Sequence, residues 1–162
     1  LLVIALAGIA IGVLYYTTWY SPSAIRRFIA IPIPEEAPDI DLNIQRTPLH
    51  FWVGDIAKAH FRLAPETLPA FLAQTCFNDN ELNEPGLRDY NPFDSDVSNP
   101  QWWKPMDATV YQGGQCRDSG RYYQILIDQT DSSMYDIYLY AYFEGFEWQV
   151  SQRRSLHEQG VG

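Results

Sequence analysis

The sequence predicts an α+β fold, in which one hydrophobic N-terminal helix precedes a small domain built on an antiparallel sheet. Three observations lead to this class. Residues 1–25 contain no charged residue, whereas residues 32–162 carry nine basic and twenty acidic residues. Residues 121–129 and 135–143 are two strand-like runs joined by a polar turn, which is typical of a β-hairpin. Apolar residues at helical spacing over residues 65–75 predict one helix packed on that sheet.

The first 20 residues predict a transmembrane helix that leaves the rest of the chain as an extramembrane domain. Residues 1–14 are an unbroken apolar run, and no charge follows before Tyr20. About 20 residues at 1.5 Å each span roughly one bilayer core. Aromatic residues gather at the C-terminal end, where they favour the water interface, and Pro22 ends the helix. A cleaved signal peptide is the alternative, because small residues follow at 21–24.

Two glycines within this span predict a place where another helix packs. Gly8 and Gly12 are four residues apart, so they form a strip of small residues on one helix face. Membrane helices need such close van der Waals contact to associate. The span contains no ionisable residue, so it predicts an anchor or a packing element and not a proton relay or a metal site.

The orientation of the span has arguments on both sides. Arg26 and Arg27 follow it directly, and positive residues favour the cytoplasmic side. The acidic domain and the aromatic residues at the exit end favour the opposite side, and long domains can be translocated largely regardless of charge. We expect the N-terminus in the cytoplasm and the C-terminal domain in the periplasm or another extracytoplasmic space.

Residues 21–48 predict an interfacial segment and a proline-rich tether. Apolar residues on one helical face of residues 23–33 predict a short helix that dips into the membrane boundary, with Arg26 and Arg27 bound to lipid headgroups. A linker strand packed on the domain is the alternative. Residues 32–48 hold four prolines and four acidic residues, so they predict an extended, semi-stiff spacer.

Residues 49–150 predict the α+β domain, and residues 151–162 a polar tail. Residues 50–53 and 58–64 are expected as short strands, and residues 78–105 as a long polar loop that is partly packed by its aromatic residues. Gly113 and Gly114 are interpreted as turn residues. On the last strand, Tyr138, Tyr140 and Tyr142 alternate with apolar residues, and with Trp102 and Trp103 they predict a protein interface.

Cys76 and Cys116 are the only cysteines in the chain. Outside the cytoplasm they are expected to form a disulfide, which is worth about 3 to 4 kcal/mol in the chain-entropy model. Two buried free thiols are an alternative that fits a cytoplasmic domain. A reactive Cys116 is a further alternative, although the three histidines of the chain are scattered and no base is placed beside it.

Composition and motifs exclude several classes of function. The acidic charge and the two lysines are unlike a nucleic-acid-binding protein, which needs a basic surface. No haem or zinc motif, glycine-rich nucleotide turn or hydrolase elbow is present. Residues 94–98 imitate the start of a calcium loop, but Asn99 and Pro105 stand where that loop needs glycine and glutamate. We expect no enzyme activity, no cofactor and no resident metal.

The sequence thus predicts a non-catalytic accessory subunit of a larger integral-membrane complex, for example a photosynthetic or respiratory one. In that function its partners are other membrane subunits and the lipid bilayer. The alternative is a free membrane-anchored binding module, which captures a soluble partner or ligand on the extracytoplasmic face.

Overall fold

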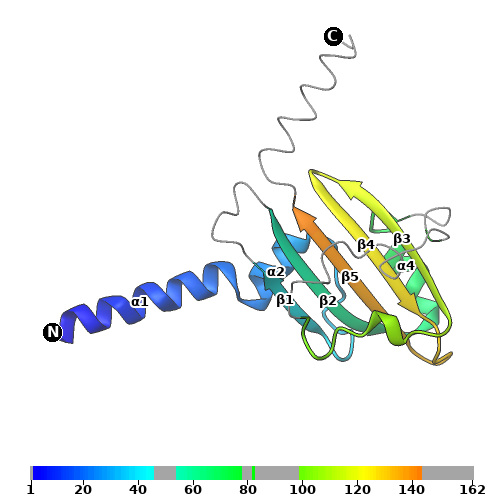
Figure 1. Cartoon of the computed structure of the whole chain (residues 1–162), viewed down its shortest axis with the longest axis horizontal. Helices are drawn as coiled ribbons and strands as arrows, with labels where there is room; N and C mark the ends of the chain where they lie inside the picture. The colour runs from blue at the N-terminus through cyan, green and yellow to red at the C-terminus, as the bar shows by residue number, and fades with distance from the viewer. Residues whose placement is uncertain (1, 46–53, 78–81, 83–98, 144–162) are drawn as a thin grey trace, which may run out of the picture.

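The chain folds as an α+β protein around a five-stranded antiparallel sheet, which confirms the predicted class (Figure 1). The computed structural model describes residues 2–45, 54–77, 82 and 99–143. The strand order is β1-β2-β5-β4-β3. In chain order the elements are α1 (Leu2–Trp19), α2 (Pro22–Ile29), β1 (Asp41–Gln45), β2 (Asp55–Leu63), the 3-10 helix η1 (Pro65–Thr67), α4 (Leu68–Leu72), the 3-10 helix η2 (Pro105–Asp107), β3 (Tyr111–Asp118), β4 (Arg121–Asp128) and β5 (Tyr135–Phe143).

The predicted C-terminal hairpin is present as β4 and β5. These strands pair antiparallel from Arg121 opposite Phe143 to Asp128 opposite Asp136. The two faces of β5 differ as its alternation predicts, because Ile137 and Leu139 lie in one hydrophobic cluster while Tyr138 lies in another. Side chains of successive residues in a strand point to opposite faces, so the sheet has one aliphatic and one aromatic face.

A second hairpin joins β3 to β4 and corrects the interpretation of Gly113 and Gly114 as turn residues. Both glycines lie within β3. The turn is formed by Ser119 and Gly120, whose φ angles are 50° and 77°. Positive φ at both central residues is typical of the two-residue turn that matches strand twist. Within β3, the Gly113 N–H donates to the Leu82 carbonyl oxygen at 3.2 Å.

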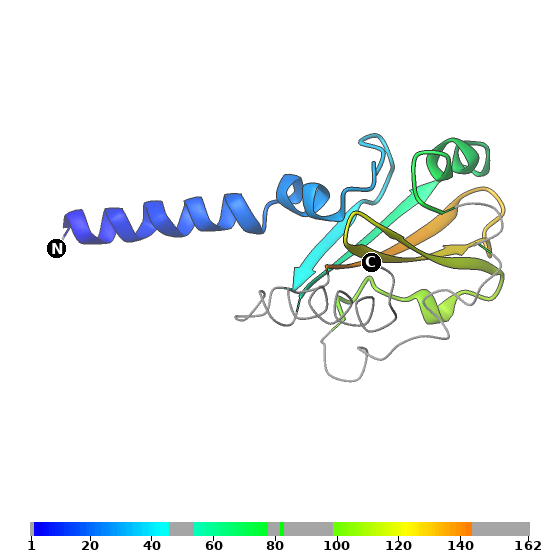
Figure 2. The ribbon, with the colours of Figure 1, turned by 90° about the horizontal axis from the view of Figure 1, so that it is seen from above.

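The aliphatic face of the sheet is covered by α2 and α4, which both lie on that side in Figure 2. Ile29 of α2 and Phe61 of β2 are fully buried. The Phe61 ring meets the Phe71 ring of α4 edge to face, at a centroid distance of 5.4 Å. The Tyr123 hydroxyl donates to the Ile29 carbonyl oxygen at 2.7 Å, which gives the C-terminal end of helix α2 a buried donor.

Residues 22–45 belong to the domain, so the predicted spacer is wrong for this part of the chain. The Ser21 hydroxyl accepts from the Ala24 N–H and begins α2. The apolar face expected to enter the membrane boundary is buried in the core, with Ile25 5% and Ile29 0% exposed. β1 then pairs with β2 along all five of its residues. The apolar face of the sheet must be covered, so the apolar residues of α2 pack against it and not against the membrane boundary.

The helix expected over residues 65–75 is present as η1 followed by α4, and it ends earlier than predicted. Pro65 and Pro69 each lie at the start of a helix, where proline is tolerated. The expected disulfide joins Cys76, just beyond α4, to Cys116 of β3, with 5.9 Å between the Cα atoms. It therefore ties the covering helix to the edge of the sheet.

Helix α1 extends away from the domain, as both ribbon views show (Figures 1 and 2). Its described side chains are exposed on all sides, and Ile11 and Leu14 reach 68% and 69%. Within the part of the chain that the structure describes, none of the helices combines the length and the hydropathy that crossing a bilayer requires.

Several predictions fall outside the described residues. They are the strand at 50–53, most of the polar loop at 78–105, the end of the domain at 144–150 and the tail at 151–162. Of that loop the structure describes residue 82 and residues 99–105, which lead into η2 on the aromatic face of the sheet.

Two buried tyrosines allow a matched test of this core. The Tyr140 hydroxyl is buried with no hydrogen-bond partner among the described residues, unlike that of Tyr123. We expect Tyr123→Phe to lower the free energy of unfolding by about 1 to 2 kcal/mol, because the buried Ile29 carbonyl loses its donor. Tyr140→Phe should leave this free energy unchanged or raise it, since it removes an unpaired buried hydroxyl. Urea unfolding followed by tryptophan fluorescence measures both, and equal losses would contradict the assignment.

Candidate functional site

The tyrosine face of β5 is covered by the chain itself, which corrects the predicted docking surface. Tyr138 and Tyr140 are each 7% exposed, and Trp103 is 9% exposed. The Trp103 and Tyr138 rings meet edge to face, with 5.6 Å between their centroids. Burial of a large aromatic side chain stabilises the fold strongly. The tyrosines of β5 and the segment with Trp103, which were expected to form one interface, therefore bury each other. Trp102 and Tyr142 lie at the margin of this cluster and remain partly exposed.

A buried lysine completes this aromatic face. Lys58 of β2 is 6% exposed, and its Nζ donates to the Asn99 side-chain oxygen. The same Nζ lies 5.0 Å from the centroid of the Trp103 ring, within the range of a cation–π contact. Lys58 therefore holds the segment that covers the tyrosines.

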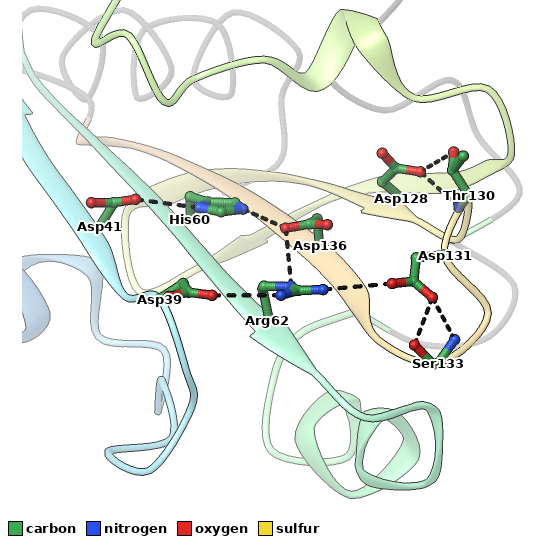
Figure 3. A network of polar contacts seen from close by, with 9 residues as sticks. All are labelled: Asp39, Asp41, His60, Arg62, Asp128, Thr130, Asp131, Ser133 and Asp136. Carbon is green, nitrogen blue, oxygen red and sulfur yellow. Dashed lines mark hydrogen bonds and ion pairs between the residues drawn. The ribbon is translucent and has the colours of Figure 1, made fainter.

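A polar network lies beside this cluster and centres on His60 of β2 (Figure 3). The His60 Nε2 is 2.8 Å from the Asp136 carboxylate of β5, and its Nδ1 is 3.5 Å from the Asp41 carboxylate of β1. The ring stacks on Tyr138 at 4.8 Å and on Trp102 at 6.2 Å between centroids. The register of the sheet creates this contact, because Asp41 and Tyr138 both lie opposite His60.

Arg62 extends the network toward the end of the sheet. Its guanidinium nitrogens lie 3.6 Å from Asp39, 3.6 Å from Asp131 and 3.7 Å from Asp136. Figure 3 shows Asp39 and Asp131 on opposite sides of the Arg62 head group. The Asp136 oxygen that meets Arg62 is the one that meets His60, so this carboxylate links the two side chains.

Two further aspartates shape the β4–β5 turn (Figure 3). Asp128 accepts from the Thr130 N–H at 2.8 Å. Asp131 accepts from both the hydroxyl and the N–H of Ser133, at 2.7 and 2.8 Å. These donations lower the pKa of Asp131, the hydroxyl contributing most, and Arg62 adds a smaller effect of the same sign. Asp131 therefore stays ionised at neutral pH, facing Arg62.

The network pairs charged side chains across strands β1, β2 and β5. Both ring nitrogens of His60 face carboxylates, Nε2 that of Asp136 and Nδ1 that of Asp41. Among the described residues, no group of three or more His, Cys, Asp or Glu side chains is arranged to hold a metal ion. The arrangement holds charged side chains in fixed positions at one end of the sheet.

An apolar pocket of about 500 Å³ opens at that end of the sheet. It lies between the segment 32–38 and helix α4, with Leu63 and Met134 also contributing to its walls. Pockets of 300–1,000 Å³ are typical of small-molecule sites. The charged side chains in the lining are Glu36 and Arg62, and the others are mainly apolar or small.

Backbone contacts hold the proline-rich wall of this pocket in place. The Arg26 guanidinium donates to the Ile33 carbonyl oxygen at 2.7 Å. The Arg62 N–H donates to the Pro38 carbonyl oxygen at 3.2 Å, which continues the pairing of β1 with β2. Prolines fix φ, so the wall loses little conformational freedom when a ligand binds. Segment 32–38, predicted as a spacer, is instead the wall of a preformed pocket.

The predicted lipid and helix-packing residues lie outside the pocket. Arg27 is exposed on α2, whereas Arg26 is half-buried because its head group binds the chain at Ile33. The predicted lipid contact is therefore left mainly to Arg27. Gly8 and Gly12 are open: a Cβ built at either position would meet no atom within 4 Å. Both stay predicted contacts for a second helix.

Neither the pocket nor the ion pairs of Arg62 were predicted from the sequence. The walls of the pocket come from segments that are distant in the chain and meet only in the folded protein. The available signal was the alternation of His60 and Arg62 with apolar neighbours in β2, combined with the aspartates at residues 39 and 131. Neither feature identifies a site without the register of the strands.

Comparisons with protein-family models, curated proteins and solved structures found no match to this chain. The pocket, the charges around it and the exposed helix α1 are therefore the features from which a function is inferred.

The buried tyrosines predict a loss of stability at high pH. Burial, with smaller contributions from the charges of Asp136, Asp128 and Asp107, raises the pKa of Tyr138 to about 12. The unfolded tyrosine loses its proton near pH 10, before the folded one does, so the unfolded state is favoured as pH rises from 10 to 12. We expect this loss to reach about 1.4 kcal/mol per pH unit for each such tyrosine.

The measurement is urea unfolding at several pH values between about 9 and 12. Tyr138→Phe should flatten the slope relative to the unmodified chain. An unchanged slope in that variant would show that Tyr138 does not stay protonated in the folded state.

Proposed function

We propose that this chain is a membrane-anchored binding module, which captures a small ligand in the pocket between segment 32–38 and α4. The pocket is the observation that carries the proposal, because it is preformed, apolar and of ligand size. Its wall is fixed by Arg26 and by the pairing of Pro38 with Arg62. A rigid wall lowers the entropic cost of binding.

The anchor is proposed from the sequence of residues 1–20 and from the exposure of α1. Residues 1–20 carry no charge. Large apolar side chains around α1 are more than half exposed, among them Leu6, Ile9 and Val13. A helix that is apolar on all sides needs an apolar environment, either lipid or other helices. α1 has 18 residues and is about 27 Å long, which is shorter than the ~30 Å of a hydrocarbon core, so the proposal rests on the uncharged run and on the exposed apolar side chains.

An extracytoplasmic position of the domain is part of this proposal. The Cys76–Cys116 pair supports it, since disulfides persist in oxidising compartments and are rare in the cytosol. The acidic surface is compatible with translocation, which depends little on the charge of a long domain. We further propose that the module is non-catalytic, with the His60 network acting as structural support for the pocket.

An accessory subunit of a larger membrane complex remains the second candidate. The specific observation in its favour is the open strip at Gly8 and Gly12 on the exposed helix α1. A second helix would approach closely there. The burial of Tyr138, Tyr140 and Trp103 weighs against docking of the domain through that face.

One capture experiment separates the two candidates. The tagged full chain is purified from its native membrane in mild detergent, and bound small molecules and proteins are identified by mass spectrometry. For the module, we expect a small molecule that Ala70→Phe displaces, because Ala70 lines the pocket from α4. The matched control is Ala73→Phe, an exposed residue of the same segment outside the lining.

The accessory subunit predicts a different outcome of the same capture. A stoichiometric membrane protein that is retained in Ala70→Phe and lost in Gly8→Leu would favour that candidate. If no small molecule is bound and Ala70→Phe equals Ala73→Phe, the module is rejected.

The orientation is tested with a membrane-impermeant thiol reagent on sealed cells. We expect labelling only after reduction, because Cys76 and Cys116 are paired and, in the proposed orientation, lie on the extracytoplasmic side of the membrane. A Cys76→Ala/Cys116→Ala chain is the control for background labelling. Labelling that requires permeabilised cells would contradict the extracytoplasmic position.

A further inference from the structure

We propose that the pocket selects an apolar molecule that carries one positive charge, such as a hydrophobic amine or guanidine. This inference rests on the proposed binding function and names its ligand class. The apolar walls of the pocket would hold the body of the ligand, and the acidic groups at one side would hold its charge.

The charge of Arg62 is already compensated within the fold. Three carboxylates surround its head group at 3.6 to 3.7 Å, from Asp39, Asp131 and Asp136. An anionic ligand that approached Arg62 would have to displace one of these carboxylates or lie against them. Like charges at such distances are unfavourable, so Arg62 does not make the pocket an acid-binding site.

Glu36 provides a negative charge in the lining of the pocket, and among the described residues no ion pair to it is found. It lies in the lining on the proline-rich wall, and it is exposed. With Arg62 balanced by its three aspartates, the surroundings of the pocket are net negative. Asp131 adds to this field, because its donors keep the carboxylate ionised. A cation on the ligand is the complement of this arrangement.

The acidic domain strengthens the same preference at long range. Residues 32–162 carry nine basic and twenty acidic residues. Such a charge raises the local concentration of cations and lowers that of anions near the surface, an effect that salt screens. The pocket volume of about 500 Å³ suits one small molecule, so the proposal commits to a small amphipathic cation.

The two methionines of the chain provide a site-specific readout. Met134 lines the pocket, whereas Met106 lies in η2 on the other face of the sheet and is 53% exposed. The full chain is labelled with ¹³C-methyl methionine and placed in nanodiscs of zwitterionic lipid. Chemical shifts of both methyl groups are then followed by NMR. A probe that only partitions into the lipid would not move the Met134 signal selectively.

Three probes of equal size separate charge from apolar burial: naphthylmethylammonium, naphthylmethanol and naphthoate. We expect naphthylmethylammonium to shift Met134 saturably and to leave Met106 unchanged. Naphthoate should bind at least about tenfold more weakly, and added salt should reduce this difference. Ala70→Phe should abolish the Met134 response to all three probes, whereas Ala73→Phe should preserve it.

Adjacent glutamates supply the matched charge test. Glu36→Gln should weaken binding of naphthylmethylammonium about three- to tenfold and leave that of naphthylmethanol unchanged. Glu35→Gln, an exposed neighbour outside the lining, should have no effect on either probe.

The outcomes distinguish the ligand class from the binding function. Naphthoate binding as tight as naphthylmethylammonium, with loss of both in Ala70→Phe, would overturn the cation preference and retain the binding module. An equal effect of Glu35→Gln and Glu36→Gln would overturn the role of Glu36. No saturable shift of Met134 with any of the three probes would overturn both the cation preference and the proposed function.

Discussion

The pairing of β2 with β5 is the constraint on which the rest of the structure depends. The two strands are paired along nine residues, from Asp55 opposite Phe143 to Leu63 opposite Tyr135. They lie on either side of the long polar segment, yet they form the centre of the sheet. At the start of β2, Gly54 has a φ of 77°, and a Cβ there would collide with the Phe143 carbonyl. Glycine thus permits the close approach at which this pairing begins.

This register decides what each face of the sheet can do. On the aliphatic face, Phe61 and Ile137 lie opposite each other and bind α2 and α4 through apolar packing. On the other face, His60 is opposite Tyr138 and Arg62 is opposite Asp136. The aromatic rings take the middle of that face, and the charges collect at its end. The pocket lies where α4 and segment 32–38 meet the charged end of the sheet.

Local pattern was sufficient for the parts of the fold whose partners are near in sequence. The β4–β5 hairpin and the helix after Pro65 each depend on a contiguous run with a regular period, and both were predicted. The disulfide was predicted from its two cysteines alone. The prediction of Gly113 and Gly114 as turn residues was wrong, because glycine occurs in strands and in turns and the local sequence does not distinguish the two.

The fold class, the alternation of β5 and the uncharged, apolar character of the first helix could be predicted from the sequence, because each depends on short runs of residues. The cysteine pair could be predicted because the chain has two cysteines. The burial of the apolar face of α2, the cover over the tyrosines and the carboxylates around Arg62 depend on contacts between distant segments. The physical reason is register: amphipathic segments have several surfaces on which they can be buried, and strand pairing selects one. As a result, segment 32–38, which was expected as a spacer, forms a pocket wall, and the tyrosines of β5, which were expected at an interface, are buried.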